Sequence, residues 1–167
     1  MAKRMLLVCA SVAAFLLCAP GTAAASTGGS VTGRGAGYFP ASAQPFPGDR
    51  VQLSITARNM PDGRVKGEFN MLHRSTSGTV LAHIRGRVDC VRVEGNTAVV
   101  TGVITKGFAT PFGVPVVGHE VSYTIVDGSP DSFAFGVDFL LGRPVGRCQP
   151  GAVFVMPVTK GHFEVDS

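Results

Sequence analysis

The chain has 167 residues, 45% of them hydrophobic, with 15 basic and 11 acidic residues. Two of the basic residues, Lys3 and Arg4, open an apolar N-terminal segment that we expect to be removed, which leaves 13 basic against 11 acidic residues and a formal charge of +2. A nearly neutral chain without runs of Lys or Arg gives no reason to expect nucleic acid or an acidic membrane surface as a partner.

The N-terminal segment has the features of a secretory signal peptide over residues 1–25. An unbroken apolar run follows the basic start, and three consecutive alanines ending at Ala25 supply the small residues needed for cleavage after Ala25. The apolar run is shorter than a membrane-spanning helix, and a Pro-Gly break rather than a basic flank follows it. We therefore predict a secreted protein, extracellular or associated with the cell wall, with no stable membrane anchor after cleavage.

The mature chain keeps two of the four cysteines, because Cys9 and Cys18 lie in the predicted signal. Cysteines of exported proteins are usually paired. We predict a Cys90–Cys148 disulfide, which would close a loop of 58 residues and stabilise the fold by about 4 kcal/mol in the chain-entropy model. An intermolecular bridge or two free thiols are the alternatives.

The composition after residue 25 predicts an all-β domain. Val, Thr, Gly and Phe are abundant, Trp is absent and helix-forming runs are few. We expect a flexible tail over residues 26–30 and a single β-domain over residues 31–167.

Residues 51–58 alternate strictly between apolar and polar side chains, which indicates a half-buried strand. A Pro-Asp-Gly turn then leads into the next strand, with Leu53 expected opposite Met71 and Ile55 opposite Phe69. For the following hairpin we expect a four-residue loop over residues 75–78. That loop would place Phe69 opposite Ile84, and Glu68 beside Arg85.

The strand that carries Cys90 changes phase. Val88 and earlier apolar residues share one parity, whereas Val91 and Val93 have the other. We predict a β-bulge at Asp89–Cys90, since one extra residue reverses the facing of everything after it. With a tight turn at Gly95–Asn96, Val91 should then meet Val100 and Val88 should meet Gly102.

Further strands are expected over residues 31–39, 119–127, 132–139 and 161–166, which makes about eight in an antiparallel meander. Such a meander forms a small barrel or, alternatively, a two-layer β-sandwich; we favour the barrel because closure removes exposed edges. Two loops interrupt the rhythm, over residues 108–118 and 140–160. They are expected to cover the barrel ends or to carry function.

Three segments resemble small secreted actinobacterial proteins of uncharacterised function: VDCVRVEGNTAVVTGVIT over residues 88–105, YTIVDGSPD over 123–131 and PVTKGHFEVDS over 157–167. The resemblance covers most of the mature chain and implies no activity. The chain departs from the pattern at Gly161-His162, where Gly-Asn is expected, and in the apolar segment over residues 108–118.

The residues that could carry chemistry form no recognisable motif. The histidines His73, His83, His119 and His162 lack metal-site spacing, and no G-x-S-x-G is present. The Gly-rich segment over residues 33–37 is interpreted as a flexible strand start rather than a dinucleotide fingerprint, because no helix follows it. We therefore expect no catalytic, cofactor or metal site, and Cys90 and Cys148 as a structural pair only.

We expect a structural or binding module without catalysis. Two alternatives remain. A hollow barrel could carry a small hydrophobic ligand, as lipocalins do. A cyclase or isomerase would instead gather Glu68, His83 and Asp138 in one cavity. Bulky inward residues such as Phe69, Met71 and Ile104 favour a filled interior.

Overall fold

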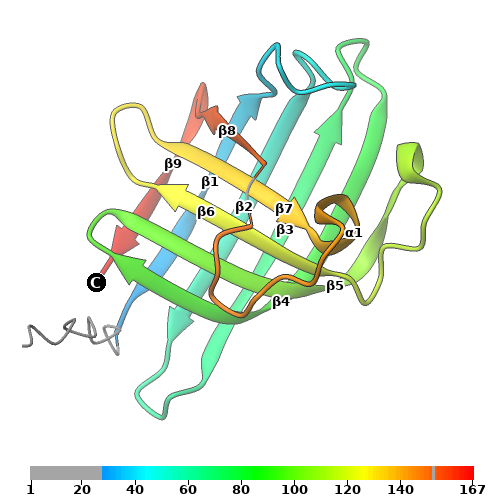
Figure 1. Cartoon of the computed structure of the whole chain (residues 1–167). Helices are drawn as coiled ribbons and strands as arrows, with labels where there is room; N and C mark the ends of the chain where they lie inside the picture. The colour runs from blue at the N-terminus through cyan, green and yellow to red at the C-terminus, as the bar shows by residue number, and fades with distance from the viewer. Residues whose placement is uncertain (1–27, 152) are drawn as a thin grey trace, which may run out of the picture.

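The computed structural model describes residues 28–151 and 153–167, and these form an all-β domain. Nine antiparallel strands follow one another in a single sheet with the order β8-β7-β6-β5-β4-β3-β2-β1-β9 (Figure 1). The strands are β1 (Ser30–Tyr38), β2 (Arg50–Asn59), β3 (Val65–Arg74), β4 (Val80–Glu94), β5 (Thr97–Ala109), β6 (Glu120–Val126), β7 (Ser132–Val137), β8 (Phe154–Pro157) and β9 (Lys160–Asp166). The predicted signal peptide over residues 1–25 lies outside the described residues.

The sheet curls into a half-barrel. Strand β8 pairs with β7 at one end of the sheet, and β9, the next strand in the chain, pairs with β1 at the other end. The predicted all-β meander with one disulfide is thus confirmed. Strand β9 is the last strand of the sheet, and no other strand of the described residues pairs with its outer edge. Carboxylates of the β6–β7 connection partly cover this edge. Asp131 accepts the Phe163 N–H at 2.7 Å, and Asp127 accepts the Val165 N–H at 3.3 Å.

Two of the predicted registers are confirmed. Leu53 lies opposite Met71 and Ile55 opposite Phe69, as the turn between β2 and β3 requires. Along β4 and β5 the register shifts between Val88 and Cys90, and beyond the shift Val91 pairs with Val100. The bulge predicted from the parity change is therefore present.

The predicted β3–β4 register is wrong by two residues. Phe69 lies opposite Gly86 rather than Ile84, and Glu68 lies opposite Arg87 rather than Arg85. The loop is one residue shorter than expected, because the Ser75 N–H donates to the Thr79 carbonyl oxygen across it, and a further irregularity lies between His73 and Arg74. A Cβ at Gly86 would overlap the ring of Phe69, so large faces small in the observed register.

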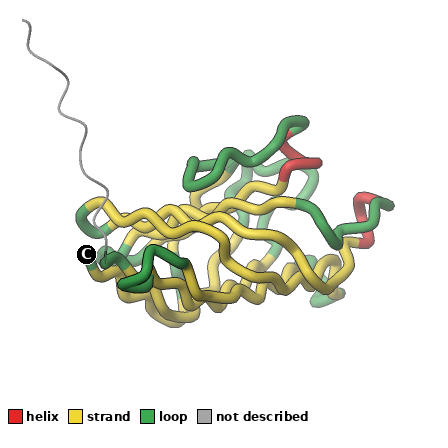
Figure 2. The backbone as a smooth tube through the Cα atoms, turned by 90° about the horizontal axis from the view of Figure 1, so that it is seen from below, coloured by secondary structure: helices red, strands yellow, loops and turns green. Residues whose placement is uncertain are grey.

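The segment over residues 140–160 is more structured than expected. It begins within the short helix α1 (Asp138–Leu141), which takes over where strand 132–139 was predicted to continue, and it includes β8. The 108–118 segment contains the 3-10 helix η1 (Thr110–Phe112). Both short helices lie toward the same end of the half-barrel (Figure 2).

The glycines of β1 lie in the interior of the strand rather than at its start. A Cβ at Gly35 would overlap the ring of Phe163, and one at Gly37 would lie 2.7 Å from the Pro157 carbonyl oxygen. These positions are glycine because β8, β9 and the Phe163 ring approach the backbone of β1 closely.

The interior is filled in one part and open in another. Tyr123, Phe133 and Phe163 are fully buried and pack with Leu53 and Ile55. The expectation of a filled interior holds for this part. It is wrong toward the end with the two short helices, where inward side chains leave a cavity.

Candidate functional site

An apolar pocket opens at the end of the half-barrel that carries η1 and α1. Its volume is about 280 Å³. Sixteen of the eighteen lining residues are apolar; Gln44 and His73 are the other two. The apolar lining is Phe39, Pro45, Phe46, Met71, Ala82, Ile84, Ile104, Ala109, Phe112, Val116, Phe135, Val137, Phe139, Leu140, Val153 and Phe154.

Phenylalanine rings form much of the wall. Six of the eleven phenylalanines of the chain line this pocket. Phe39 lies 6.0 Å from Phe135 between ring centroids, and Phe112 bridges Phe46 at 5.8 Å and Phe139 at 5.6 Å. Rings at these separations attract one another through edge and face contacts, so the wall is held together by its own side chains.

The two segments singled out as long loops supply part of this wall. Phe112 and Val116 come from residues 108–118, and Leu140, Val153 and Phe154 come from residues 140–160. They lie at the end of the barrel as expected, but they leave space between themselves and the sheet. The two loops were expected to cover the end of the barrel or to carry function. They cover this end only in part and form the wall of a pocket.

One ionisable side chain lines the pocket, and a carboxylate holds it in place. His73 is the last inward residue of β3 and is 4% exposed. Its Nε2 lies 2.9 Å from Oδ2 of Asp49, whose Oδ1 accepts the Thr76 N–H at 2.9 Å. The imidazole ring stands edge-on to Phe39 and Phe46, with centroids 5.3 and 5.1 Å away. The ring is thus fixed by one hydrogen bond and two aromatic contacts.

The protonation state of His73 follows from this environment. Burial lowers the pKa of His73, and the hydrogen bond and charge of Asp49 raise it by less, so the pKa lies below its ordinary value of 6.5. The ring is therefore neutral at neutral pH. A carboxylate only accepts, so the single ring proton sits on Nε2 and is donated to Asp49. Nδ1 is left as an acceptor, and it has no hydrogen-bond partner among the described residues.

A second histidine–carboxylate pair lies outside this pocket. Nδ1 of His119 is 2.6 Å from Oδ1 of Asp138, and Oδ2 of Asp138 accepts the Glu120 N–H at 3.1 Å. The two side chains are 34% and 21% exposed and border a shallow surface depression with Arg143. The pair fixes the start of α1 against β6, and the depression beside it is open to solvent.

The third pair, His162 with Asp131, belongs to the edge of β9. Burial raises the pKa of Asp131, but the N–H groups of Phe163 and Gly128 and the neighbouring His162 lower it by more, so the pKa lies below the ordinary 3.8. The ionised carboxylate is therefore part of the fold. His162 is mostly exposed, which makes the pair an edge contact rather than a reactive site.

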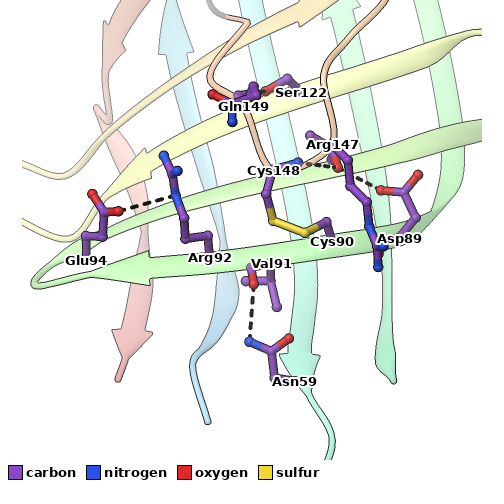
Figure 3. The surroundings of a disulfide bond; sticks show 11 residues. Asn59, Asp89, Cys90, Val91, Arg92, Glu94, Ser122, Arg147, Cys148 and Gln149 are labelled. Atoms are coloured by element: carbon purple, nitrogen blue, oxygen red, sulfur yellow. Dashed lines mark hydrogen bonds and ion pairs between the residues drawn. A yellow bond between two sulfur atoms is a disulfide. The ribbon is translucent and has the colours of Figure 1, made fainter. Parts of the chain in front are cut away.

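Cys90 and Cys148 form the predicted disulfide, with Cα atoms 5.5 Å apart. It joins the bulge of β4 to the segment that carries Arg147 and Gln149 (Figure 3). Thr101 donates to Asp89 at 2.7 Å and accepts the Cys148 N–H at 3.3 Å. Both sulfur atoms are bonded to each other in the disulfide, so neither cysteine has a free thiol to act as a nucleophile.

The hypothetical cluster of Glu68, His83 and Asp138 does not form. Glu68 and His83 point away from the interior. On the outer face, Nε2 of His83 lies 2.8 Å from Oδ1 of Asn70. Asp138 is paired with His119 instead. An enzyme built on these three residues is therefore ruled out by their positions.

Sequence reasoning passed over His73, which lines the cavity, and its partner Asp49. His73 shares the inward parity of Phe69 and Met71, so its place in the alternating pattern was the available signal. Nothing local connects it to Asp49, which precedes β2 and reaches His73 only after β2 and β3 pair.

Searches against protein-family models, curated proteins and solved structures found no match to this chain. In the part of the chain that the structure describes, no group of three or more His, Cys, Asp or Glu side chains is placed to hold a metal ion. None of the helices within residues 28–151 and 153–167 has the length and apolar character needed to cross a membrane.

Proposed function

We propose that this protein is an exported binding module that holds a small, largely apolar molecule in the pocket at the end of the half-barrel. The pocket itself supports this proposal: about 280 Å³ of space bounded almost wholly by hydrocarbon side chains. Cavities of about 150 Å³ with similar walls bind benzene, and ordinary ligand sites begin near 300 Å³. A ligand with one or two rings suits the size.

Three observations support export. The N-terminal segment has signal-peptide features, the disulfide suits an oxidising compartment, and the pattern around residues 88–105 resembles secreted actinobacterial proteins. The exported chain should begin at Ser26, which N-terminal sequencing of protein from a culture supernatant would establish. A mature chain that retains residues 1–25 would contradict the proposal.

The binding proposal is tested by titrating the mature protein with naphthalene and following amide chemical shifts by NMR. At about 0.5 kcal/mol per heavy atom, a ten-atom ligand gains about 5 kcal/mol, which corresponds to a Kd of about 0.2 mM. The shifts should be confined to the pocket, with Phe39, Ala109 and Phe154 among the residues affected. No saturable shift at these positions would refute the proposal.

A graded series at Ala109 provides the matched variants. Ala109 is 7% exposed and lines the pocket, so Ala109→Val, Ala109→Leu and Ala109→Phe should fill it step by step and weaken naphthalene binding in the same order. Val155→Phe is the control, because Val155 is 63% exposed, on the strand that carries Phe154. Equal weakening by the control and by Ala109→Leu would show that the pocket is not the site.

A further inference from the structure

His73 and Asp49 form a buried polar pair in a part of the molecule where apolar side chains would serve stability as well. Their side chains are only 5% and 8% exposed. Burying such a pair costs desolvation, and well-packed apolar residues of similar volume are often as stabilising. The pair is therefore poorly explained as a stabilising element of the core, and the position of His73 on the pocket wall suggests a role toward what the pocket holds.

Besides the amide of Gln44, the arrangement leaves Nδ1 of His73 as a hydrogen-bonding group for a ligand. The Asp49 carboxylate is used by Nε2 of His73 and by the Thr76 N–H. The contacts of Phe39 and Phe46 hold the imidazole ring in place. Nδ1 carries no proton in the neutral ring, so it can accept a hydrogen bond but cannot donate one.

We infer that the ligand of this pocket is a small aromatic or alicyclic molecule with one hydroxyl group, which donates its proton in a hydrogen bond to Nδ1 of His73. This inference rests on the proposed function and names the ligand class of the same site. An apolar body fills the space between the phenylalanines, and a single donor satisfies Nδ1 of His73. A ligand that can only accept, such as an ether, leaves Nδ1 facing another lone pair.

The selectivity of such a site comes from the acceptor, because a hydroxyl group without a partner is costly to bury. In this pocket a hydrogen bond to Nδ1 of His73 replaces the hydrogen bond to water that the hydroxyl group loses on binding. A hydroxyl and a methyl group occupy about the same volume and fit between the apolar walls equally well, but the hydroxyl is costly to bury unless it is hydrogen-bonded. Discrimination between them therefore measures the hydrogen bond.

Three compounds with the same ring system test the inference: 1-naphthol, 1-methylnaphthalene and 1-methoxynaphthalene. With the wild-type protein we expect 1-naphthol to bind about tenfold more tightly than either of the others. The double variant His73→Phe/Asp49→Asn, which keeps a flat ring and an acceptor for the Thr76 N–H, should abolish that preference and still bind 1-methylnaphthalene. His83→Gln, on the outer face, is the control and should leave the preference unchanged.

A spectroscopic measurement on the wild-type protein keeps the test independent of how well the double variant folds. The ¹⁵N resonance of His73 Nδ1 should move on addition of 1-naphthol and stay in place with 1-methylnaphthalene. Equal affinity for 1-naphthol and 1-methylnaphthalene, or an Nδ1 resonance that ignores 1-naphthol, would overturn the inference while leaving the apolar pocket as a binding site. Absence of binding by all three compounds would overturn both proposals.

Discussion

The carboxylate of Asp131 offers a sharp test of how the half-barrel is held together. It accepts the buried Phe163 N–H at 2.7 Å and the Gly128 N–H at 3.0 Å, and it lies 3.0 Å from Nδ1 of His162. The Asp131→Ala variant removes all three acceptor contacts. It leaves the Phe163 N–H without a partner in a place that water does not reach freely.

The expected loss follows from the burial of each donor. A buried N–H that loses a charged acceptor costs about 2 kcal/mol, and the partly buried Gly128 N–H costs about 1 kcal/mol. The contact with His162 adds little, because its side chain is 64% exposed. The free energy of unfolding should therefore fall by about 3 kcal/mol, and Tm by about 12 °C for a domain of this size.

Urea unfolding followed by circular dichroism measures this loss, and amide hydrogen exchange shows where it acts. The Phe163 amide should exchange faster in Asp131→Ala than in the wild type. Glu164→Gln is the matched control, because it removes a charge from the same strand. The side chain of Glu164 has no hydrogen-bond partner among the described residues, so the change in stability should be less than about 0.5 kcal/mol. A Tm loss in Asp131→Ala no larger than that in the control would refute the closure of the β9 edge by this carboxylate.

Two further predictions concern His73 and Gly86. The pKa of His73 is lowered in the folded state, so below pH 6.5 the unfolded chain binds a proton at this residue more readily than the folded chain does. The free energy of unfolding should therefore be at its full value above pH 6.5 and fall as the pH drops below it. Urea unfolding at pH 7.5 and 5.5 should show this fall in the wild type and in His83→Gln but a smaller one in His73→Phe/Asp49→Asn, and equal falls would contradict it. Gly86→Ala should cost about 3 kcal/mol, because its Cβ would overlap both the Phe69 ring and the Val103 carbonyl oxygen. Gly28→Ala, with no neighbour within 4 Å of its Cβ, should be neutral. A neutral Gly86→Ala would refute the explanation given for the β3–β4 register.

Local pattern was sufficient for the facing of most strands and for the bulge at Cys90. Alternation with a period of two places Leu53 and Ile55 inside whatever their neighbours are, and the change of parity after Val88 requires an extra residue wherever the strand pairs. The disulfide could be predicted because a single partner for Cys90 remains in the predicted mature chain.

The β3–β4 register could not be read in the same way. A shift of two residues keeps every side chain on its own face, so alternation cannot distinguish the predicted pairing from the observed one. The choice depends on how the ring of Phe69 fits over Gly86, and that fit exists only when the two strands lie side by side.

The sequence by itself thus determined an antiparallel all-β meander and its inward and outward faces, because these follow from neighbours along the chain, and the Cys90–Cys148 cross-link, because the predicted mature chain contains two cysteines. Only the tertiary structure decided the pocket. Its walls come from eight strands and connections, and its ionisable side chain, His73, depends on an aspartate brought to it by strand pairing. A cavity is the space that such segments leave between them, and no local pattern of residues records it.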